Sequence, residues 1–178
     1  MSNIKPEDPA AYYKKHPLSL QPITSANWVA CIDLQPTTHQ QERGFVSPNV
    51  LSLAQAYAER WWIPTAVYAQ QTMVGFILYG CWPAAPIAAE YGRREAGLHH
   101  ILRMMIDQQY QGQGYGHAAM HTLIAHIRAQ PDARAIELNY DVDNSVAARL
   151  YARLGFEPTG EVDEGEIRAR LVLGVRER

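Results

Sequence analysis

The chain has 178 residues, a mass of 20.0 kDa and a formal net charge of −2, and 47% of its residues are hydrophobic. At roughly 100–200 residues per domain this length predicts one domain, and the apolar content excludes intrinsic disorder for most of it. The balanced charge argues against a nucleic-acid-binding protein, whose phosphate contacts need an excess of Lys and Arg. We expect a loose N-terminal arm over residues 1–16 and a single folded domain over residues 17–178.

The lack of an apolar targeting segment and the presence of only two cysteines predict a cytoplasmic location. No apolar stretch reaches the ~20 residues that cross a bilayer, and the N-terminus lacks the apolar core of a signal peptide. The sequence therefore predicts a cytoplasmic protein without membrane contacts, in which Cys31 and Cys81 are free thiols. No metal site is expected, because the chain has neither a Cys-x-x-Cys pair nor a His-Glu-x-x-His motif, although His117 and His121 are four residues apart.

The first part of the chain is predicted to begin with a strand and a helix. Residues 18–23 are typical of a strand, and Thr24 or Ser25 can cap a helix that extends to about Leu34. Residues 35–48 contain two prolines and a glycine, and we expect them to form a loop with a short helical piece.

An amphipathic helix is predicted from Asn49 to Trp61, because its apolar residues recur at helical spacing. We expect this apolar stripe to face the core; it consists of Val50, Leu53, Ala54, Tyr57, Ala58 and Trp61. Pro64 stops the helix. Two strand-like runs follow, residues 65–69 and residues 73–81, at the spacing of a hairpin.

The second half alternates strands and helices. The predicted order is strand 99–106, glycine-rich turn 111–116, helix 115–129, strand 134–139, helix 144–154 and two short strands near 156–159 and 166–173. Strands interleaved with helices predict an α/β fold, with a twisted mixed sheet of about seven strands and helices on both of its faces.

The glycine-rich turn is the most informative segment, because it joins a strand to a helix. Gly112, Gly114 and Gly116 expose backbone N–H groups that no Cβ covers, and the helix start adds unpaired N–H groups and a positive dipole end. These features predict a phosphate or diphosphate site. A P-loop is disfavoured because His117 stands where its Lys is needed, and the Gly-x-Gly-x-x-Gly spacing of a dinucleotide turn is also absent. A glycine-rich loop without a ligand stays open as an alternative.

Two motifs carry a family resemblance. The run 111–116, Gln-Gly-Gln-Gly-Tyr-Gly, has the form Gln/Arg-x-x-Gly-x-Gly/Ala and resembles the acetyl-CoA loop of the GCN5-related N-acetyltransferase (GNAT) superfamily. The run from Asn144 to Phe156 resembles that superfamily's Asn-x-x-Ala-x-x-Leu-Tyr-x-x-x-Gly-Phe segment. Residues 45–49 and 74–80 are similar to bacterial diamine/spermidine-type acetyltransferases. The resemblance implies a GNAT-like sheet with splayed central strands, acetyl-CoA as acetyl donor, and a homodimer.

The resemblance also implies roles for individual residues. The diphosphate would be held by Gln111, Gly112, Gln113, Gly114, Tyr115 and Gly116. A backbone N–H near Met105 or Ile106 would stabilise the oxyanion, Asn144 would contact the cofactor, and Tyr151 would protonate the leaving thiolate. Read from the residues alone, Asn144 is a helix N-cap and Tyr151 is a core aromatic on an apolar helix face.

The general base is the point at which the sequence departs from the resemblance. Polyamine acetyltransferases of this superfamily commonly carry a carboxylate nine residues before the glycine loop, and here that position is Leu102. Strand alternation predicts His100 on the same face as Leu102 and Met104, which makes it one candidate base. Other candidates are Glu90, Glu95, Asp107 and a water chain.

The resulting prediction is an acetyl-CoA-dependent N-acetyltransferase that acts on a primary amine of a small cationic acceptor, by direct attack in a ternary complex. The acidic residues Asp163, Glu164 and Glu166 would suit such an acceptor, and a solvated turn explains them equally well. Acceptors at a protein N-terminus or lysine, a non-catalytic acyl-CoA-binding module and a nucleotide-binding regulator are the alternatives.

Overall fold

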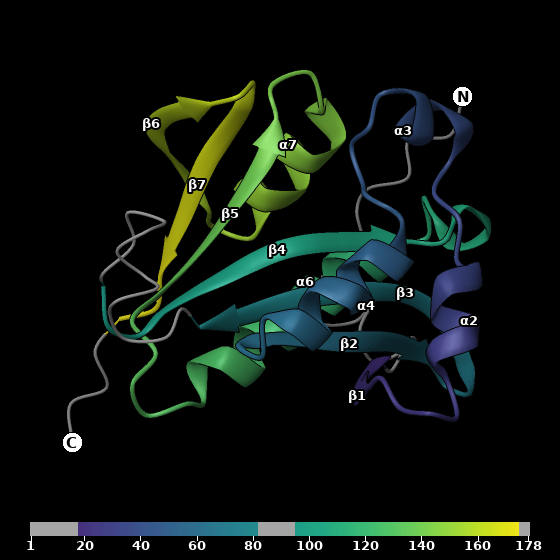
Figure 1. The fold of residues 1–178 in the computed structure, drawn as a ribbon. Coiled ribbons are helices and arrows are strands. Elements are labelled where there is room, and N and C mark those ends of the chain that lie inside the picture. Colours follow the sequence, from purple (N-terminus) through teal and green to yellow (C-terminus); the bar gives the residue numbers. More distant parts are fainter. Residues whose placement is uncertain (1–17, 82–94, 175–178) are drawn as a thin grey trace.

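The computed structural model describes residues 18–81 and 95–174, and in this part of the chain a single seven-stranded sheet runs through the molecule (Figure 1). The strand order is β1-β2-β3-β4-β5-β7-β6, and β4–β5 is the parallel pair. The strands are β1 Leu18–Pro22, β2 Trp62–Ala69, β3 Thr72–Cys81, β4 Leu98–Ile106, β5 Ala135–Asp141, β6 Glu157–Asp163 and β7 Glu166–Val172. The predicted α/β class and mixed sheet are confirmed. The expected N-terminal arm and Glu90 lie outside the described residues.

Helices cover both faces of the sheet (Figure 1). The helical elements are α2 Trp28–Asp33, α3 Thr38–Glu42, α4 Asn49–Ala58, the short helix η1 Gln108–Tyr110, α6 Tyr115–Arg128 and α7 Ser145–Arg153. One core lies under α6 and α7 and the other under α2 and α4, so the sheet separates two apolar clusters. No described helix has the length and apolar character needed to cross a membrane. Cys31 and Cys81 are free thiols, as predicted.

Two predicted helices differ from the observed ones. Helix α2 begins only at Trp28, because Thr24 and Asn27 form a turn in which the Asn27 side chain accepts the Thr24 N–H at 2.7 Å. Helix α4 has the predicted start but ends at Ala58. Of its predicted stripe, Leu53 and Trp61 pack against the core, whereas Val50 is 53% and Tyr57 75% exposed.

The face of α4 that is buried carries small and polar residues, Asn49, Ser52 and Ala56. The Asn49 amide donates to the Cys31 carbonyl at 2.8 Å, which fastens α4 to α2. Small side chains let the helix approach the sheet closely, so hydrophobicity alone predicted only part of the buried face.

The two central strands form a fork. Strands β4 and β5 pair only from Leu98 with Ala135 to Ile101 with Leu138. Beyond these pairs both strands continue, β4 to Ile106 and β5 to Asp141, without pairing to one another. Backbone N–H and C=O groups along the inner edges of the fork are therefore not used by the sheet, which is the splay that the resemblance implied.

Strand β4 also contains a bulge at the fork. Its register with β3 pairs Leu78 with Arg103 and Tyr79 with Ile101, so Leu102 is the extra residue. The bulge turns both Leu102 and Arg103 toward α4, whereas Met104 packs on the opposite, α6-side core. The prediction that Leu102 and Met104 share a face with His100 is therefore wrong for Met104, because the bulge breaks the alternation on which it rested.

Candidate active site

The glycine-rich loop connects η1 to α6 and leaves the start of α6 open. Gly112 has φ +74° and Gly114 has φ +83°, and Gly114 is the N-cap residue of α6. The first N–H of α6 with a helical partner is that of Ala118, which donates to the Gly114 carbonyl at 3.1 Å, and no side chain caps the helix. The loop therefore leads into the positive end of a 14-residue helix, the kind of helix start that attracts an anion.

Gln111 holds this loop in place. Its side-chain amide donates to the Ile106 carbonyl at 2.8 Å and to Gln40 Oε1 at 2.9 Å. Gln40 Oε1 also accepts the Thr37 N–H at 3.0 Å in the capping box of α3. The Gln111 side chain is thus engaged within the protein, and it ties the loop both to β4 and to α3.

The inner edge of β4 presents particular backbone groups to the fork. The N–H of Asp107 donates to a carbonyl of β3 at 2.9 Å. Because backbone groups alternate between the two edges of a strand, the N–H groups of Ile106 and Met104 face the fork and that of Met105 faces β3. The Ile106 carbonyl, which accepts from Gln111, lies on the same inner edge. Of the two expected oxyanion positions, Ile106 points into the fork.

A cleft of about 460 Å³ fills the space between the splayed strands. It is lined by β4 from Ile101 to Ile106, by the loop and the first turn of α6, by α7, and by residues 44–47 before α4. Among its walls are two carboxylates, Asp141 and Glu166, which face one another in the register of β5 and β7. Met104 and Ile106 thus lie in one continuous cavity with the glycine-rich loop.

Tyr151 and Asn144 reach this cleft from α7. Asn144 is the N-cap residue, and its Oδ1 accepts the Ala147 N–H at 3.0 Å. The Tyr151 ring lies 5.7 Å from the ring centre of Tyr140 and 5.9 Å from that of Phe156. Burial raises the pKa of Tyr151 to about 12, so its phenol stays protonated at neutral pH.

The sequence matches the acetyltransferase (GNAT) family over residues 27–156. The chain belongs to this family. It is an N-acetyltransferase whose acetyl donor is acetyl-CoA. The uncapped start of α6, the glycine-rich loop and the free inner edge of β4 fit a diphosphate followed by an extended amide-containing arm, which is the chemistry of coenzyme A.

Known acetyltransferases resemble the chain over most of its length. Spermine/spermidine N(1)-acetyltransferase of Bacillus subtilis (strain 168) is 29% identical over 147 residues, which are 82% of this chain and 91% of that protein. Spermidine N-acetyltransferase from Vibrio cholerae, solved with CoA and spermine, has a TM-score of 0.65 at 15% identity and covers 88% of this chain and 95% of its own. PaiA N-acetyltransferase from Thermoplasma acidophilum, solved with coenzyme A, has a TM-score of 0.63 at 12% identity. The match covers 87% of this chain and 98% of that protein. The two structures share the fold of this acetyltransferase.

The candidate bases of the acetyltransferase lie away from the cleft, so far as the structure describes them. His100 is 4% exposed in the paired part of β4, packs 6.2 Å from the Trp62 ring and does not line the cleft. Both carboxylate oxygens of Asp107 accept backbone N–H groups, from Gln35 at 2.8 Å and from Gln109 at 2.9 Å. These positions give His100 and Asp107 structural partners and no contact with the cleft.

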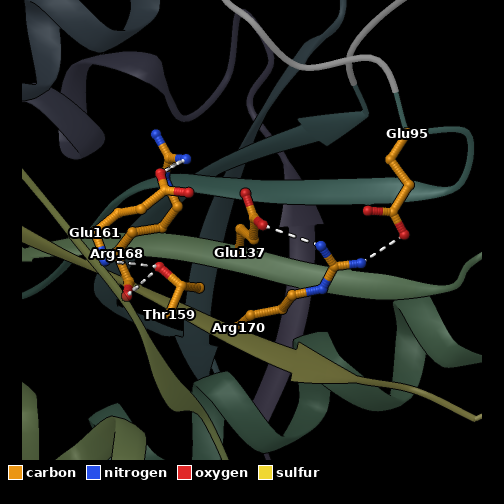
Figure 2. A network of polar contacts seen from close by, with 6 residues as sticks. All are labelled: Glu95, Glu137, Thr159, Glu161, Arg168 and Arg170. Atoms are coloured by element: carbon orange, nitrogen blue, oxygen red, sulfur yellow. Dashed lines mark hydrogen bonds and ion pairs between the residues drawn. The ribbon is translucent and has the colours of Figure 1, made fainter.

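Sequence patterns missed a polar wall on the open face of β5, β7 and β6, which Figure 2 shows from close by. The term polar wall refers below to six residues: Glu95, Glu137, Thr159, Glu161, Arg168 and Arg170. Arg170 pairs with Glu137 at 3.3 Å and with Glu95, a candidate base that is thereby engaged in an ion pair. Arg168 pairs with Glu161. Only the alternation of charged residues in residues 166–170 hinted at this wall.

Asn139 was also missed, and it belongs to the cleft. It is the first residue of β5 beyond the last pair with β4, Ile101 with Leu138. Its Oδ1 atom is buried and has no hydrogen-bond partner. No motif marks this residue, because its position depends on where the two strands part.

Proposed function

We propose that the protein transfers the acetyl group of acetyl-CoA to a primary amine of a small cationic acceptor, by direct attack within a ternary complex. One observation carries the proposal: a single cleft connects the start of α6 with the fork, and the carboxylates Asp141 and Glu166 line its far wall. No described residue forms an ion pair with either carboxylate, although Asp141 Oδ1 accepts the Asp143 N–H at 2.8 Å, so neither negative charge is balanced by a cation before an ammonium group binds.

The donor would lie along β4. The first-turn N–H groups of α6 and the loop residues from Gln111 to Gly116 would bind the diphosphate, and Asn144 would border the arm from α7. From the loop the arm would run toward the fork, adding to β4 as an extended strand. It would therefore meet the N–H of Ile106 first and that of Met104 second. The Met104 N–H, next to the bulge, would then hold the oxygen of the reacting carbonyl.

The reaction balances as follows. The acceptor ammonium, with an ordinary pKa near 10.4, first releases a proton to water. The neutral amine nitrogen then attacks the thioester carbon, the C–N bond forms and the C–S bond breaks. The amide nitrogen loses its second proton, and the sulfur of CoA gains one. The products are an N-acetylated amine and free CoA.

Tyr151 would act on the leaving sulfur. A thiol has an ordinary pKa of about 8.5, so complete proton transfer from a phenol with a pKa of about 12 is uphill by roughly 5 kcal/mol. Tyr151 would therefore stabilise the thiolate as a hydrogen-bond donor, and water would complete its protonation. A permanently protonated phenol suits this role at every physiological pH.

The acceptor is the finer part of the proposal. The B. subtilis relative is named for spermine and spermidine, which supports a polyamine-like amine here. Leu102 supplies no carboxylate on the β4 wall, whereas Asp141 and Glu166 supply two on the opposite wall. The charge that attracts a cationic acceptor would thus lie on β5 and β7 instead of β4.

The test is release of free thiol from acetyl-CoA with a panel of diamines, polyamines, amino acids and peptides. We expect the highest kcat/KM with diamines or polyamines, and a several-fold loss for them in Glu166→Gln. Preference for a peptide N-terminus or lysine would overturn the acceptor class. Binding of CoA without thiol release to any amine would overturn the catalytic proposal.

A homodimer and a cytoplasmic location also belong to this proposal. The exposed apolar residues Val50, Leu51 and Tyr57 of α4 offer a surface that a second copy could cover. Two free cysteines are in keeping with a reducing compartment. Analytical ultracentrifugation of the full chain and of Tyr57→Glu would test the dimer; a monomeric wild type would contradict it.

A further inference from the structure

The fork places Asn139 opposite the position at which this chain lacks a carboxylate. Parallel pairing of β4 and β5 ends with Ile101 and Leu138, so the next residues of the two strands are Leu102 and Asn139. Both line the cleft. Leu138 packs in the α6-side core, so alternation turns Asn139 to the other face, toward which the bulge also turns Leu102. The polar group nearest the bulge on the opposite strand is therefore an amide.

The Asn139 oxygen is unsatisfied. Its Oδ1 is buried without a hydrogen-bond partner, and native proteins rarely leave buried acceptors in this state. Its neighbour across the β5–β7 pair is Arg168, whose Nε is also buried and unpartnered. The Arg168 guanidinium is paired through Nη1 with Glu161 on β6 (Figure 2). Glu161 thus holds Nη1 of Arg168, whereas the Arg168 Nε, like Asn139 Oδ1, has no partner.

An unpartnered oxygen can turn without losing a bond. The terminal torsion of an Asn side chain is soft, so Oδ1 can rotate from its buried position into the cleft when a donor arrives there. Under the proposed function, the donor that reaches this end of the cleft is the acceptor amine. An amide oxygen can accept an N–H from this amine but cannot take a proton from it.

We propose that Asn139 positions the attacking amine: its Oδ1 accepts one N–H of the neutral acceptor at the fork and directs the nitrogen lone pair toward the thioester carbon. This inference rests on the proposed function. It adds that the site orients a neutral amine and leaves deprotonation to water. The rate of wild-type enzyme should therefore follow the neutral fraction of the acceptor, rising with pH toward the pKa of the amine near 10.4.

The test compares Asn139→Ala with Asn139→Asp in the thiol-release assay across pH. We expect Asn139→Ala to lower kcat/KM for the amine about tenfold, the effect of one hydrogen bond, and to leave KM for acetyl-CoA unchanged. Asn139→Asp places a carboxylate that can accept the amine proton. Its kcat/KM should exceed that of Asn139→Ala, and its pH profile should level off at a lower pH than that of the wild type.

Two further variants separate positioning from structure. Arg168→Gln removes the neighbour of Asn139 and, on our inference, keeps the wild-type pH profile. Thr159→Val is the matched control on the polar wall and should keep wild-type kinetics. If Arg168→Gln reproduces the kinetics of Asn139→Ala, or if Asn139→Ala and Asn139→Asp lose equal activity with an unchanged pH profile, Asn139 is structural and the inference is wrong.

The inference and the proposed function can fail separately. A wild type that turns over amines while Asn139→Ala retains its full kcat/KM overturns only the role of Asn139. A wild type that binds CoA by calorimetry but releases no thiol with any amine overturns the proposed function, and the inference with it.

Discussion

Tyr151 combines two properties: it borders the cleft, and its pKa is raised to about 12 by burial. We expect Tyr151→Phe to lower kcat about 100-fold, within the range for loss of one positioned hydrogen-bond donor, with KM for acetyl-CoA nearly unchanged. Because the phenol stays protonated, no alkaline limb below pH 10 should arise from it. Steady-state kinetics checks both points. Tyr79→Phe, which removes a buried hydroxyl away from the cleft, is the control; an unchanged kcat in Tyr151→Phe would remove Tyr151 from the mechanism.

The second prediction concerns His99 and the dependence of protein stability on pH. It is buried in β4, its Nδ1 has no partner, and burial followed by the nearby His126 lowers its pKa below 6.5. The unfolded chain therefore binds more protons than the folded one below about pH 6.5. Stability should be full above that pH and should fall as the pH drops toward the folded-state pKa, by at most about 1.4 kcal/mol per pH unit.

Urea unfolding at pH 7.5, 6 and 5 measures this dependence. In His99→Gln the acid-side loss should shrink, because residue 99 then carries no titrating group. His121→Gln, a substitution at an exposed position of α6, should keep the wild-type dependence. Equal slopes in wild type and His99→Gln would refute the assignment.

At the scale of elements, the backbone conformation of the turn into α6 requires a glycine at position 114 but not at position 116. Gly114 has φ +83°, which costs a residue with a Cβ about 1–2 kcal/mol. Gly116 is helical, and a Cβ there would meet only ordinary contacts, with Met104, Ile106 and Leu150 at 3.6–3.9 Å. We expect Gly114→Ala to weaken CoA binding about tenfold and Gly116→Ala to bind normally. Calorimetry measures the CoA affinity of both variants. An equal loss of affinity in the two would show that the left-handed conformation of Gly114 does not determine CoA binding.

Local patterns could predict most elements but not how they face one another. The glycine-rich turn and the hairpin at Gln70 and Gln71 follow from short-range signals, and both formed as predicted. The buried face of α4 followed only in part, because the Asn49 amide reaches the Cys31 carbonyl across 18 residues. A bulge at Leu102 leaves no mark in a single sequence, so the faces of β4 beyond it were predicted incorrectly.

The site was predictable where one segment builds it and unpredictable where distant segments meet. The loop from Gln111 to Gly116 is contiguous, so its geometry could be anticipated. The hydrogen bond from Gln111 to Gln40 joins residues that are 71 positions apart in the sequence. The ion pair of Arg43 with Asp143 connects the α3 side of the cleft to the β5–α7 turn and joins residues 100 positions apart. Such contacts follow from the topology of the sheet, and no periodicity encodes them.

At the scale of the whole molecule, the fork divides the sheet into two halves that share only a short parallel pairing of β4 with β5. One half carries the loop and α6, and the other carries α7, β6 and β7. A ligand that contacts Ile106 on one side and Asn144 on the other would connect them and raise the cost of separating the halves. Acetyl-CoA should therefore stabilise the protein as a unit.

Saturating CoA at about 100 times its Kd contributes about 2.7 kcal/mol, and a chain of this size gains about 2–4 °C in Tm per kcal/mol. We expect a rise of about 5–10 °C, together with slower hydrogen exchange in both β4 and β5. Pantetheine, which lacks the phosphates, should give a much smaller shift, and Gly114→Ala should need more CoA for the same effect. Protection confined to the loop and α6 would mean that the ligand binds one half alone, and the cleft would then be a diphosphate site without an arm in the fork.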